Sequence, residues 1–492
     1  MQDNNLCYAT PESQGIPSEI ISEFLDDLQQ KKLAMHSFML MRHGKVISEG
    51  YWQHFNADRR QRMYSISKSF TSAAIGMMID EGKIAIDDKV ADYFPDYIPE
   101  NPHPHILEAT IRHLLMMSAC NNYTSYGPSD KDWVKTFFQE SGTKHRPGTA
   151  FSYDTAATVV LCDIVEKISG KLMLEYMRPV FDEIGISKDI TCIKSPDGRS
   201  WTGSGVLCTL RDLSRFALLC MNKGTWNGKQ LISREYMEAA TSCQINNSVM
   251  SNDSQFQYGY GYQFWCLKDG GFACLGMGGQ VALCLPKYDL ILTTTADNQI
   301  ISSGIEHIAD CYFALVDKIA KIKENTLSDN SEAQKILQEK ISSLTIPLPE
   351  GCKTTKDAAV YSGKRYIMQR NHMGLKWISV DIEPEVCIVN YANEAGEHSI
   401  TLGMGNYAVQ KFPEKYFGLN IGIKDVNYDT IAAGAWWDEK TLLGKIYAID
   451  DHLGTIKMQL TFSDDNICVL MTKAAEWFFD SYQGFATGYA DK

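Results

Sequence analysis

Hydrophobic and polar positions follow different periods in the two parts of this chain. In the first part, residues 18–32 (SEIISEFLDDLQQKK) repeat with a helical period, and residues 37–52 (SFMLMRHGKVISEGYW) have the pattern of paired strands. An amphipathic helix that leads into a β-hairpin is therefore predicted. Residues 1–320 as a whole mix helical periods with short strands, which is an α/β pattern.

Alternation of apolar and polar residues takes over in the last part of the chain. It is clearest in residues 375–382 (LKWISVDI), 398–405 (HSITLGMG) and 454–462 (GTIKMQLTF), where every second side chain falls on one face. We expect residues 346–492 to form an all-β domain, a small antiparallel barrel or sandwich, with the barrel favoured. The charged residues 321–345 have few aromatics and run into prolines, so they are expected to be a linker with a solvated helix.

The segment from Met63 to Lys83 (MYSISKSFTSAAIGMMIDEGK) begins with a polar cluster and then becomes apolar. If a helix begins near Ser65, Lys68 lies one turn later on the same face, and the apolar positions beyond it pack into a core. A serine hydroxyl is a weak nucleophile at neutral pH, and a desolvated lysine beside it can take its proton. The pattern predicts a serine nucleophile with a lysine base.

The S-x-x-K spacing occurs twice, so the spacing alone identifies no site. Ser141 and Lys144 repeat it within SGTKHRPGT, but Gly142 and Pro147 surround this pair with turn signals. No helix would align these two side chains. The second copy shows what a chance match looks like, and a serine at the start of a helix can also be a simple cap.

Two further segments accompany the first copy. A Pro-Gly turn leads to Tyr153 just before an apolar helix in RPGTAFSYDTAATVVLCDIVEKISG, and residues 272–298 form a glycine-rich hairpin, FACLGMGGQVALCLPKYDLILTTTADN. With Ser65 and Lys68, these segments resemble the serine hydrolases of the class C β-lactamase, penicillin-binding protein and carboxylesterase superfamily. The resemblance covers about residues 10 to 320. It implies an antiparallel sheet flanked by helices, with an additional helical region.

The chain departs from the family pattern in two motifs. The family has S-x-x-K, then Y-x-N, then K-T-G or a variant. Here Thr155 replaces the asparagine, and Met277 stands where the third motif usually has a cation. That cation helps to hold a substrate carboxylate in β-lactamases and transpeptidases, so its absence favours esters and uncharged amides. The form of this motif resembles that of carboxylesterases and hydrolases of short linear amides of the nylon-oligomer type.

The resemblance implies catalytic roles for three residues. Ser65 would attack a carbonyl carbon, Lys68 and Tyr153 would transfer its proton, and water would hydrolyse the resulting acyl-enzyme. No metal or other cofactor is implied. The substrate would be a small ester, an amide or a short peptide.

The third motif implies the second half of the site. The oxyanion would lie between the backbone N–H groups of Ser65 and Gln280. Gly278 and Gly279, next to Met277, would let the strand edge approach the substrate closely. The aromatic run YGYGYQFW could line an acyl pocket, although such runs more often lie in a core.

Composition narrows the class of protein. The chain has 492 residues with 47 Lys and Arg against 60 Asp and Glu, a net charge of −13, which argues against nucleic acid or an anionic membrane as a main partner. No signal-peptide pattern or bilayer-length apolar run occurs, so a cytoplasmic location is expected. The 14 cysteines are scattered and are expected to be reduced. The oligomeric state stays open.

Sequence patterns typical of other enzyme classes are absent from this chain. The chain has no G-x-S-x-G, H-E-x-x-H or Walker pattern. The principal alternative is a non-catalytic or weakly catalytic relative of penicillin-binding proteins that holds an acyl ligand as a sensor or binding protein. Among enzymes, a D-aminopeptidase or a β-lactamase are the alternatives to an esterase or amidase.

Overall fold

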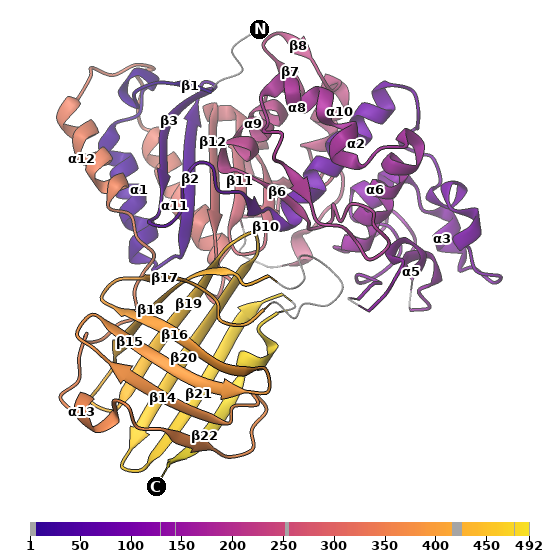
Figure 1. Ribbon diagram of the computed structural model, residues 1–492. Coiled ribbons are helices and arrows are strands. Elements are labelled where there is room, and N and C mark those ends of the chain that lie inside the picture. Colours follow the sequence, from indigo (N-terminus) through magenta and orange to yellow (C-terminus); the bar gives the residue numbers. More distant parts are fainter. Residues whose placement is uncertain are drawn as a thin grey trace. The chain divides into compact units, whose positions relative to one another are not determined.

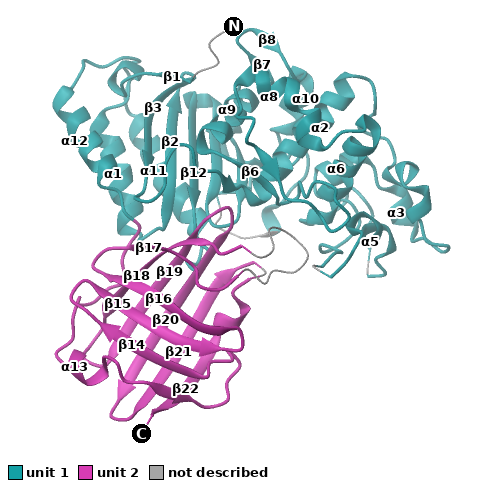
Figure 2. Cartoon of the chain, viewed as in Figure 1, with its two compact units in different colours: residues 1–345 teal, residues 346–492 magenta. Residues whose placement is uncertain are grey.

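The chain forms two compact units, Met1–Thr345 and Ile346–Lys492, which are coloured separately in Figure 2. The computed structural model describes residues 6–127, 129–142, 144–250, 255–415, 426–476 and 478–491. The segment expected to be a linker, 321–345, is part of the first unit. Its helix α12 (Ser331–Ser342) packs on α1 (Ser18–Gln30) and buries Ala333, Leu337 and Ile341, so this segment is anchored by an apolar stripe.

A mixed sheet forms the centre of the first unit (Figure 1). Its described strands, in spatial order, are β1 (Cys7–Tyr8), β3 (Lys45–Tyr51), β2 (Met35–Arg42), β12 (Leu290–Ala296), β11 (Gln280–Leu285), β10 (Phe272–Gly276) and β9 (Trp265–Cys266). The hairpin and the preceding helix predicted from the sequence are β2–β3 and α1. The pairs are antiparallel, as expected, except that the two-residue strand β1 at the edge runs parallel to β3.

Successive side chains of each strand point to opposite faces of this sheet, and helices cover both faces. Phe24 of α1 meets Phe38 of β2 edge to face, with ring centroids 6.3 Å apart. On β12, Thr293 bonds to Ser214 of α9 (Leu210–Met221), with 2.6 Å between the hydroxyl oxygens. The remaining described α-helices of this unit are α2 (Ser67–Asp80), α3 (Pro104–Glu108), α4 (Ile111–Leu115), α5 (Trp133–Gln139), α6 (Thr155–Ser169), α7 (Met173–Tyr176), α8 (Arg178–Ile184), α10 (Arg234–Ala240) and α11 (Gly304–Ile319). A small three-stranded sheet has the order β4 (Gln61–Arg62), β6 (Val206–Cys208), β5 (Thr191–Cys192), and β7 (Thr225–Trp226) pairs with β8 (Lys229–Gln230).

Helix α2 lies inside the helical region rather than on its surface. All residues from Ser67 to Met78 are buried, including the apolar positions expected to face the core. Helix α2 packs against α6 and α10. The helix ends at Asp80, and Gly82 follows with a left-handed φ of 66°, a conformation that glycine adopts readily after a helix.

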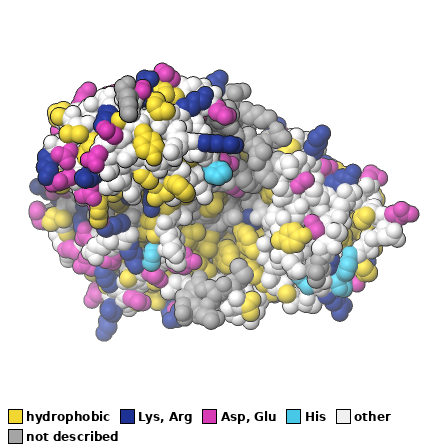
Figure 3. All heavy atoms as spheres, turned by 90° about the horizontal axis from the view of Figure 1, so that it is seen from below, with side chains coloured by type: hydrophobic (Ala, Val, Ile, Leu, Met, Phe, Trp, Pro, Cys, Tyr) yellow, Lys and Arg dark blue, Asp and Glu magenta, His cyan; other side chains and the backbone are white. Residues whose placement is uncertain are grey.

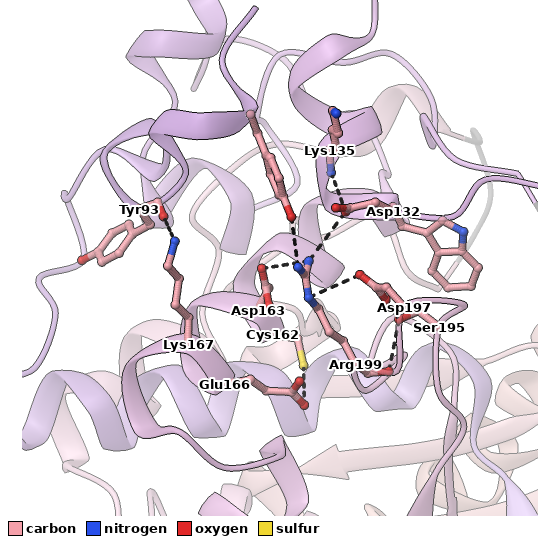
Figure 4. A network of polar contacts seen from close by, with 12 residues as sticks. Tyr93, Asp132, Lys135, Cys162, Asp163, Glu166, Lys167, Ser195, Asp197 and Arg199 are labelled. Atoms are coloured by element: carbon pink, nitrogen blue, oxygen red, sulfur yellow. Dashed lines mark hydrogen bonds and ion pairs between the residues drawn. The ribbon is translucent and has the colours of Figure 1, made fainter.

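Arg199 ties the helical region together (Figure 4). Its guanidinium lies 3.1 Å from Asp163 of α6, 3.3 Å from Asp197 and 3.6 Å from Asp132, and it donates to the Tyr97 hydroxyl at 3.0 Å. Burial raises the pKa of Asp163 to about 6 although Arg199 lowers it. Arg199 therefore joins the middle of α6 to the segments that carry Tyr97, Asp132 and Asp197.

The second unit is a closed barrel, as expected from the alternation. Its ten-stranded sheet has the order β16-β15-β14-β13-β22-β21-β20-β19-β18-β17, and β16 also pairs with β18, which closes nine of these strands into a ring. The strands are β13 (Tyr366–Met368), β14 (Trp377–Ile382), β15 (Val386–Asn393), β16 (Gly396–Met404), β17 (Ala408–Lys411), β18 (Asp429–Trp436), β19 (Thr441–Ile449), β20 (Leu453–Ser463), β21 (Asn466–Ala475) and β22 (Gly484–Ala490); the short helix α13 is Ala358–Tyr361. Ile456, Met458, Leu460 and Phe462 all point into the core.

The surface carries no extended region of one charge on the face drawn in Figure 3. Lys and Arg side chains lie among Asp and Glu side chains there, in the described part of the chain. Among the described residues, no helix is both long and apolar enough to cross a bilayer. All 14 cysteines have free thiols.

Candidate active site

Ser65 lies in a 3-10 turn (η2, Tyr64–Ile66) that runs directly into α2. Its side chain caps no helix, which separates it from the simple capping role. Tyr64, the residue before it, has a φ of 47°, in the left-handed region that costs energy for a side chain of this size. Arg62 packs against this turn, with its guanidinium 4.3 Å from the centre of the Tyr64 ring.

Lys68 is the nearest charged group to the Ser65 hydroxyl. Its Nζ donates to Ser65 Oγ at 3.0 Å and to the Gly203 carbonyl oxygen at 2.6 Å, and only 1% of the residue is exposed. One turn of helix separates the two residues, so the S-x-x-K spacing brings them together as predicted. The carbonyl of Gly203 orients the amine toward the serine.

Tyr153 lies on the other side of Ser65, at the end of the segment that leads into α6. Burial raises the pKa of Tyr153 to about 12, although a hydrogen bond with Ser65 lowers it in part. Its ring stacks on Trp265 with centroids 5.7 Å apart, and Lys68 Nζ lies 5.0 Å from its centre. Tyr153 is therefore a neutral phenol at physiological pH, in contact with both Ser65 and Lys68.

The glycine-rich hairpin approaches the same turn. Strands β10 and β11 pair up to Gly276 and Gln280, and Met277, Gly278 and Gly279 form the loop between them. A Cβ atom on Gly276 would lie 2.2 Å from the carbonyl oxygen of Met63, so only glycine permits this approach. The nucleophile turn and the edge of β10 are thus in direct backbone contact.

These residues open into a cavity of about 390 Å³. Its lining is mostly apolar or aromatic, with one carboxylate. It consists of Ser65, Tyr153, Phe256, Gln257, Trp265, Leu275, Gly276, Met277, Ile305 and Glu306. Among the described residues, no group of three or more His, Cys, Asp or Glu side chains is arranged to hold a metal ion.

Several residues expected to line the site do not. Gln280 is fully buried, and its amide donates to the carbonyl oxygens of Met277 at 2.9 Å and Ala296 at 2.7 Å. Gly278 and Gly279 form the turn but do not line the cavity. Thr155 begins α6, where its N–H donates to Thr124 Oγ1 at 3.0 Å. The short hairpin loop places Met277 on the cavity and turns Gln280 into the sheet.

The structure adds lining residues that sequence patterns did not identify. Trp265 is the last residue of the aromatic run YGYGYQFW, and no pattern in that run distinguishes it from its neighbours. Tyr260 and Tyr262 of the same run are buried, and Tyr262 accepts a hydrogen bond from Arg112 at 2.8 Å. Leu275, Ile305 and Glu306 come from a strand and from the start of α11, whose proximity no local pattern reveals.

Asp154 lies behind the site rather than in it. Its Oδ1 accepts from the N–H of Ala156 at 2.8 Å and so caps α6, and the residue does not line the cavity. Burial raises the pKa of Asp154 to about 7, although the charge of Lys68 lowers it in part.

Comparison with known proteins gives relatives of the first unit. A family model described as Beta-lactamase matches residues 20–299, more than half of the chain. The 6-aminohexanoate-dimer hydrolase of Paenarthrobacter ureafaciens is 25% identical over 312 residues, covering 58% of this chain and 78% of that protein.

Solved structures show the same fold at low sequence identity. A Bacillus anthracis protein described as a 6-aminohexanoate-dimer hydrolase aligns with a TM-score of 0.53 at 21% identity, covering 65% of this chain and 89% of that chain. EstCE1, described as a hydrolase with promiscuous acyltransferase activity, aligns with a TM-score of 0.50 at 14% identity, covering 60% and 99%. The family match and the common fold agree with the resemblance inferred from the sequence. The chain belongs to the Beta-lactamase family.

Proposed function

We propose that this protein is a serine hydrolase that cleaves small esters or linear amides through an acyl-enzyme on Ser65. The observation that carries the proposal is the 3.0 Å contact between Lys68 Nζ and Ser65 Oγ, with the Tyr153 phenol on the same hydroxyl and an apolar cavity in front. This is the geometry of a nucleophile with an adjacent base. The relative from Paenarthrobacter ureafaciens, a hydrolase of an amide dimer by its name, supports the same chemistry.

The first step transfers the Ser65 proton to Lys68. With Lys68 as a free amine, Ser65 Oγ forms a bond to the substrate carbonyl carbon, and its proton moves to Lys68 Nζ. The carbonyl π electrons move onto oxygen, which gives a tetrahedral oxyanion. The Gly203 carbonyl accepts a hydrogen bond from Nζ at 2.6 Å and stabilises the resulting ammonium.

Tyr153 protonates the leaving group. Because its pKa is raised to about 12, Tyr153 stays protonated until it donates its proton to the leaving oxygen or nitrogen. The Lys68 ammonium then donates a proton to Tyr153. Breaking the C–O or C–N bond leaves the acyl group on Ser65. Water attacks this ester by the reverse transfers and releases the acid.

The oxyanion is assigned to the N–H groups of Ser65 and Met277. Gln280 pairs with Gly276 in the β10–β11 ladder, whereas Met277 lies outside that ladder and lines the cavity beside Ser65. Two backbone donors at the nucleophile turn and the adjacent loop form a preorganised hole for negative charge. This assignment replaces Gln280 as the second donor.

The cavity favours neutral or cationic substrates. Its described lining contains no Lys or Arg, and its single ionisable carboxyl side chain is Glu306. A substrate carboxylate against Met277 would lose its water without gaining a partner, and Glu306 would repel it. Penicillin-like and carboxylate-terminated substrates should therefore be poor.

Labelling and turnover together test the proposal. A fluorophosphonate should modify Ser65, located by peptide mass spectrometry, and intact mass after incubation with esters, linear amides, D-amino-acid amides and a penicillin should show which acyl groups are captured and released. Capture without release would instead favour the sensor alternative. Release only of D-amino acids, or hydrolysis of penicillin, would assign the chain to a D-aminopeptidase or a β-lactamase. No modification of Ser65 would contradict the proposal.

Met277→Lys is expected to change the preference for charge. A new ammonium that makes one charge-assisted hydrogen bond should improve kcat/KM for an anionic substrate, relative to a matched neutral ester, by about 10- to 150-fold. Met277→Leu, which keeps the wall apolar, is the control and should leave the ratio within about twofold. If the parent protein already prefers the anion, or if the ratio stays constant, this wall does not select substrate charge.

A further inference from the structure

The barrel contains a second, larger cavity that has no part in the proposed hydrolysis. Its volume is about 1190 Å³, and all its lining residues belong to the second unit. They lie in the loop after β13, the β15–β16 turn, the ends of β17 and β18, and the β21–β22 connection. Because neighbouring strands are antiparallel, these segments gather at one end of the barrel.

A carboxylate stands on the buried side of this cavity. Glu414 lines it and is only 6% exposed. Its Oε1 accepts hydrogen bonds from Tyr391 Oη at 2.9 Å, from Asn393 Nδ2 at 2.9 Å and from the Tyr482 hydroxyl, and the two tyrosine oxygens are 2.7 Å apart. Burial raises the pKa of both tyrosines, so they remain neutral donors. Three donors therefore fix one oxygen of the carboxylate.

The other carboxylate oxygen has no such partner. Within the described residues, Glu414 Oε2 accepts no hydrogen bond, and neither a lysine nor an arginine forms an ion pair with this side chain. His398 Nε2 is 3.9 Å from Oε1, the oxygen that is already occupied, and lies 3.2 Å from Asn393 Oδ1. A buried carboxylate is normally paired with a cation, because its desolvation is costly. Arg370, Lys376 and Lys415 also line the cavity, but among the described residues none of them forms an ion pair with Glu414. Glu414 Oε2 is therefore left to accept a hydrogen bond from a bound cation.

Aromatic rings form the wall next to this carboxylate. Phe412, Phe479 and Tyr482 contact one another, with centroids of Phe412 at 4.8 Å from Phe479 and 5.2 Å from Tyr482. Tyr428 and Phe478 stack at 5.2 Å beside them. All five line the cavity and are at most 9% exposed. Ring faces attract cations, and ring surfaces bury an apolar chain.

We propose that this cavity binds a primary ammonium compound with an alkyl or arylalkyl body. The ammonium would donate to Glu414 Oε2, where it supplies the missing positive charge, and the apolar body would lie against the aromatic wall. A carboxylate ligand would be repelled by Glu414, and an alcohol would bring no charge. The cavity is large enough for a drug-sized ligand. This site is independent of the proposed hydrolysis.

Methionine methyl NMR on the full chain locates the ligand. Met368 and Met373 line the barrel cavity, and Met277 lines the cavity beside Ser65, so each site has its own reporter. Signals of ¹³C-methyl methionine are assigned by single Met→Leu variants. Titration with n-hexylammonium or 2-phenylethylammonium should shift Met368 and Met373, whether or not Met277 also responds. 1-Hexanol and hexanoate should bind about thirtyfold more weakly or not at all.

Two variants separate Glu414 from general electrostatics. Glu414→Gln should weaken hexylammonium binding by about thirtyfold or more, because the ion pair is lost while the shape is kept. Glu394→Gln removes the same charge from an exposed residue of the same cavity and should change the affinity by less than about twofold. Unchanged methyl signals of the free variants show that the barrel is folded.

Three results would overturn the proposal. These are hexylammonium shifts at Met277 alone, equal affinity for hexanol and hexylammonium, and undiminished binding by folded Glu414→Gln. The comparison of alcohol with ammonium uses only the unmodified protein, so it decides the question even if the variant does not fold.

Discussion

Ser65→Ala is expected to abolish hydrolysis of every substrate that the parent protein turns over, with a loss in kcat/KM of about 10³-fold or more. The hydroxyl removed is the one that Lys68 contacts at 3.0 Å, and no other described serine lines the cavity. Steady-state kinetics on the best ester or amide, with fluorophosphonate labelling in parallel, measures the effect. Labelling should be lost together with turnover.

The chain offers a matched control for this variant. Ser141 belongs to the second S-x-x-K copy, is exposed, and does not line the cavity, so Ser141→Ala should retain full activity. Ser65 caps no helix, and its loss should lower the melting temperature by only a few degrees. Full turnover by folded Ser65→Ala would remove the basis of the proposed function.

Lys68→Ala and Tyr153→Phe are each expected to lower kcat by about 10²- to 10⁴-fold. Both side chains act on the same proton, since both contact Ser65 Oγ. The double variant should therefore be little worse than the worse single variant, because two members of one proton-transfer unit do not contribute additively. The measurement is a double-mutant cycle in kcat/KM.

Lys144→Ala, from the second S-x-x-K copy, is the control for loss of a lysine and should leave kcat unchanged. Lys68 is buried, so circular dichroism and thermal melting must accompany its variant. Losses that multiply in the double variant would mean that Lys68 and Tyr153 serve separate steps.

The local patterns predicted more of the nucleophile side of the site than of the hairpin side. Ser65 and Lys68 are about one helical turn apart in the continuous segment formed by the 3-10 turn and the start of α2, so their contact is local and the sequence contains that information. The orientation of Met277 and Gln280 depends on the length of a hairpin loop. A change of one residue reverses which side chain faces the cavity.

Periodicity predicted the α/β character of the first unit and the β strands of the second, and the family resemblance implied the β-lactamase-like fold. Contacts between distant segments followed from neither. The charged segment before residue 346 has an apolar residue at every fourth position of α12, but only the structure shows that α1 covers it. In the barrel, Glu414 meets Tyr391 and Tyr482 from other strands and loops. No spacing along the chain predicts such a meeting.

Because Gly276 contacts the Met63 carbonyl, residue 276 and its neighbour, residue 277, differ in which substitutions they can accept. Position 276 must stay without a side chain, because any Cβ would push the strand away from the nucleophile turn. Met277, the next residue, lines the cavity beside Ser65. Evolution, or a library in the laboratory, can therefore vary residue 277 to select new substrates while the catalytic geometry is inherited unchanged. Residue 276 is the position that such a library should leave untouched.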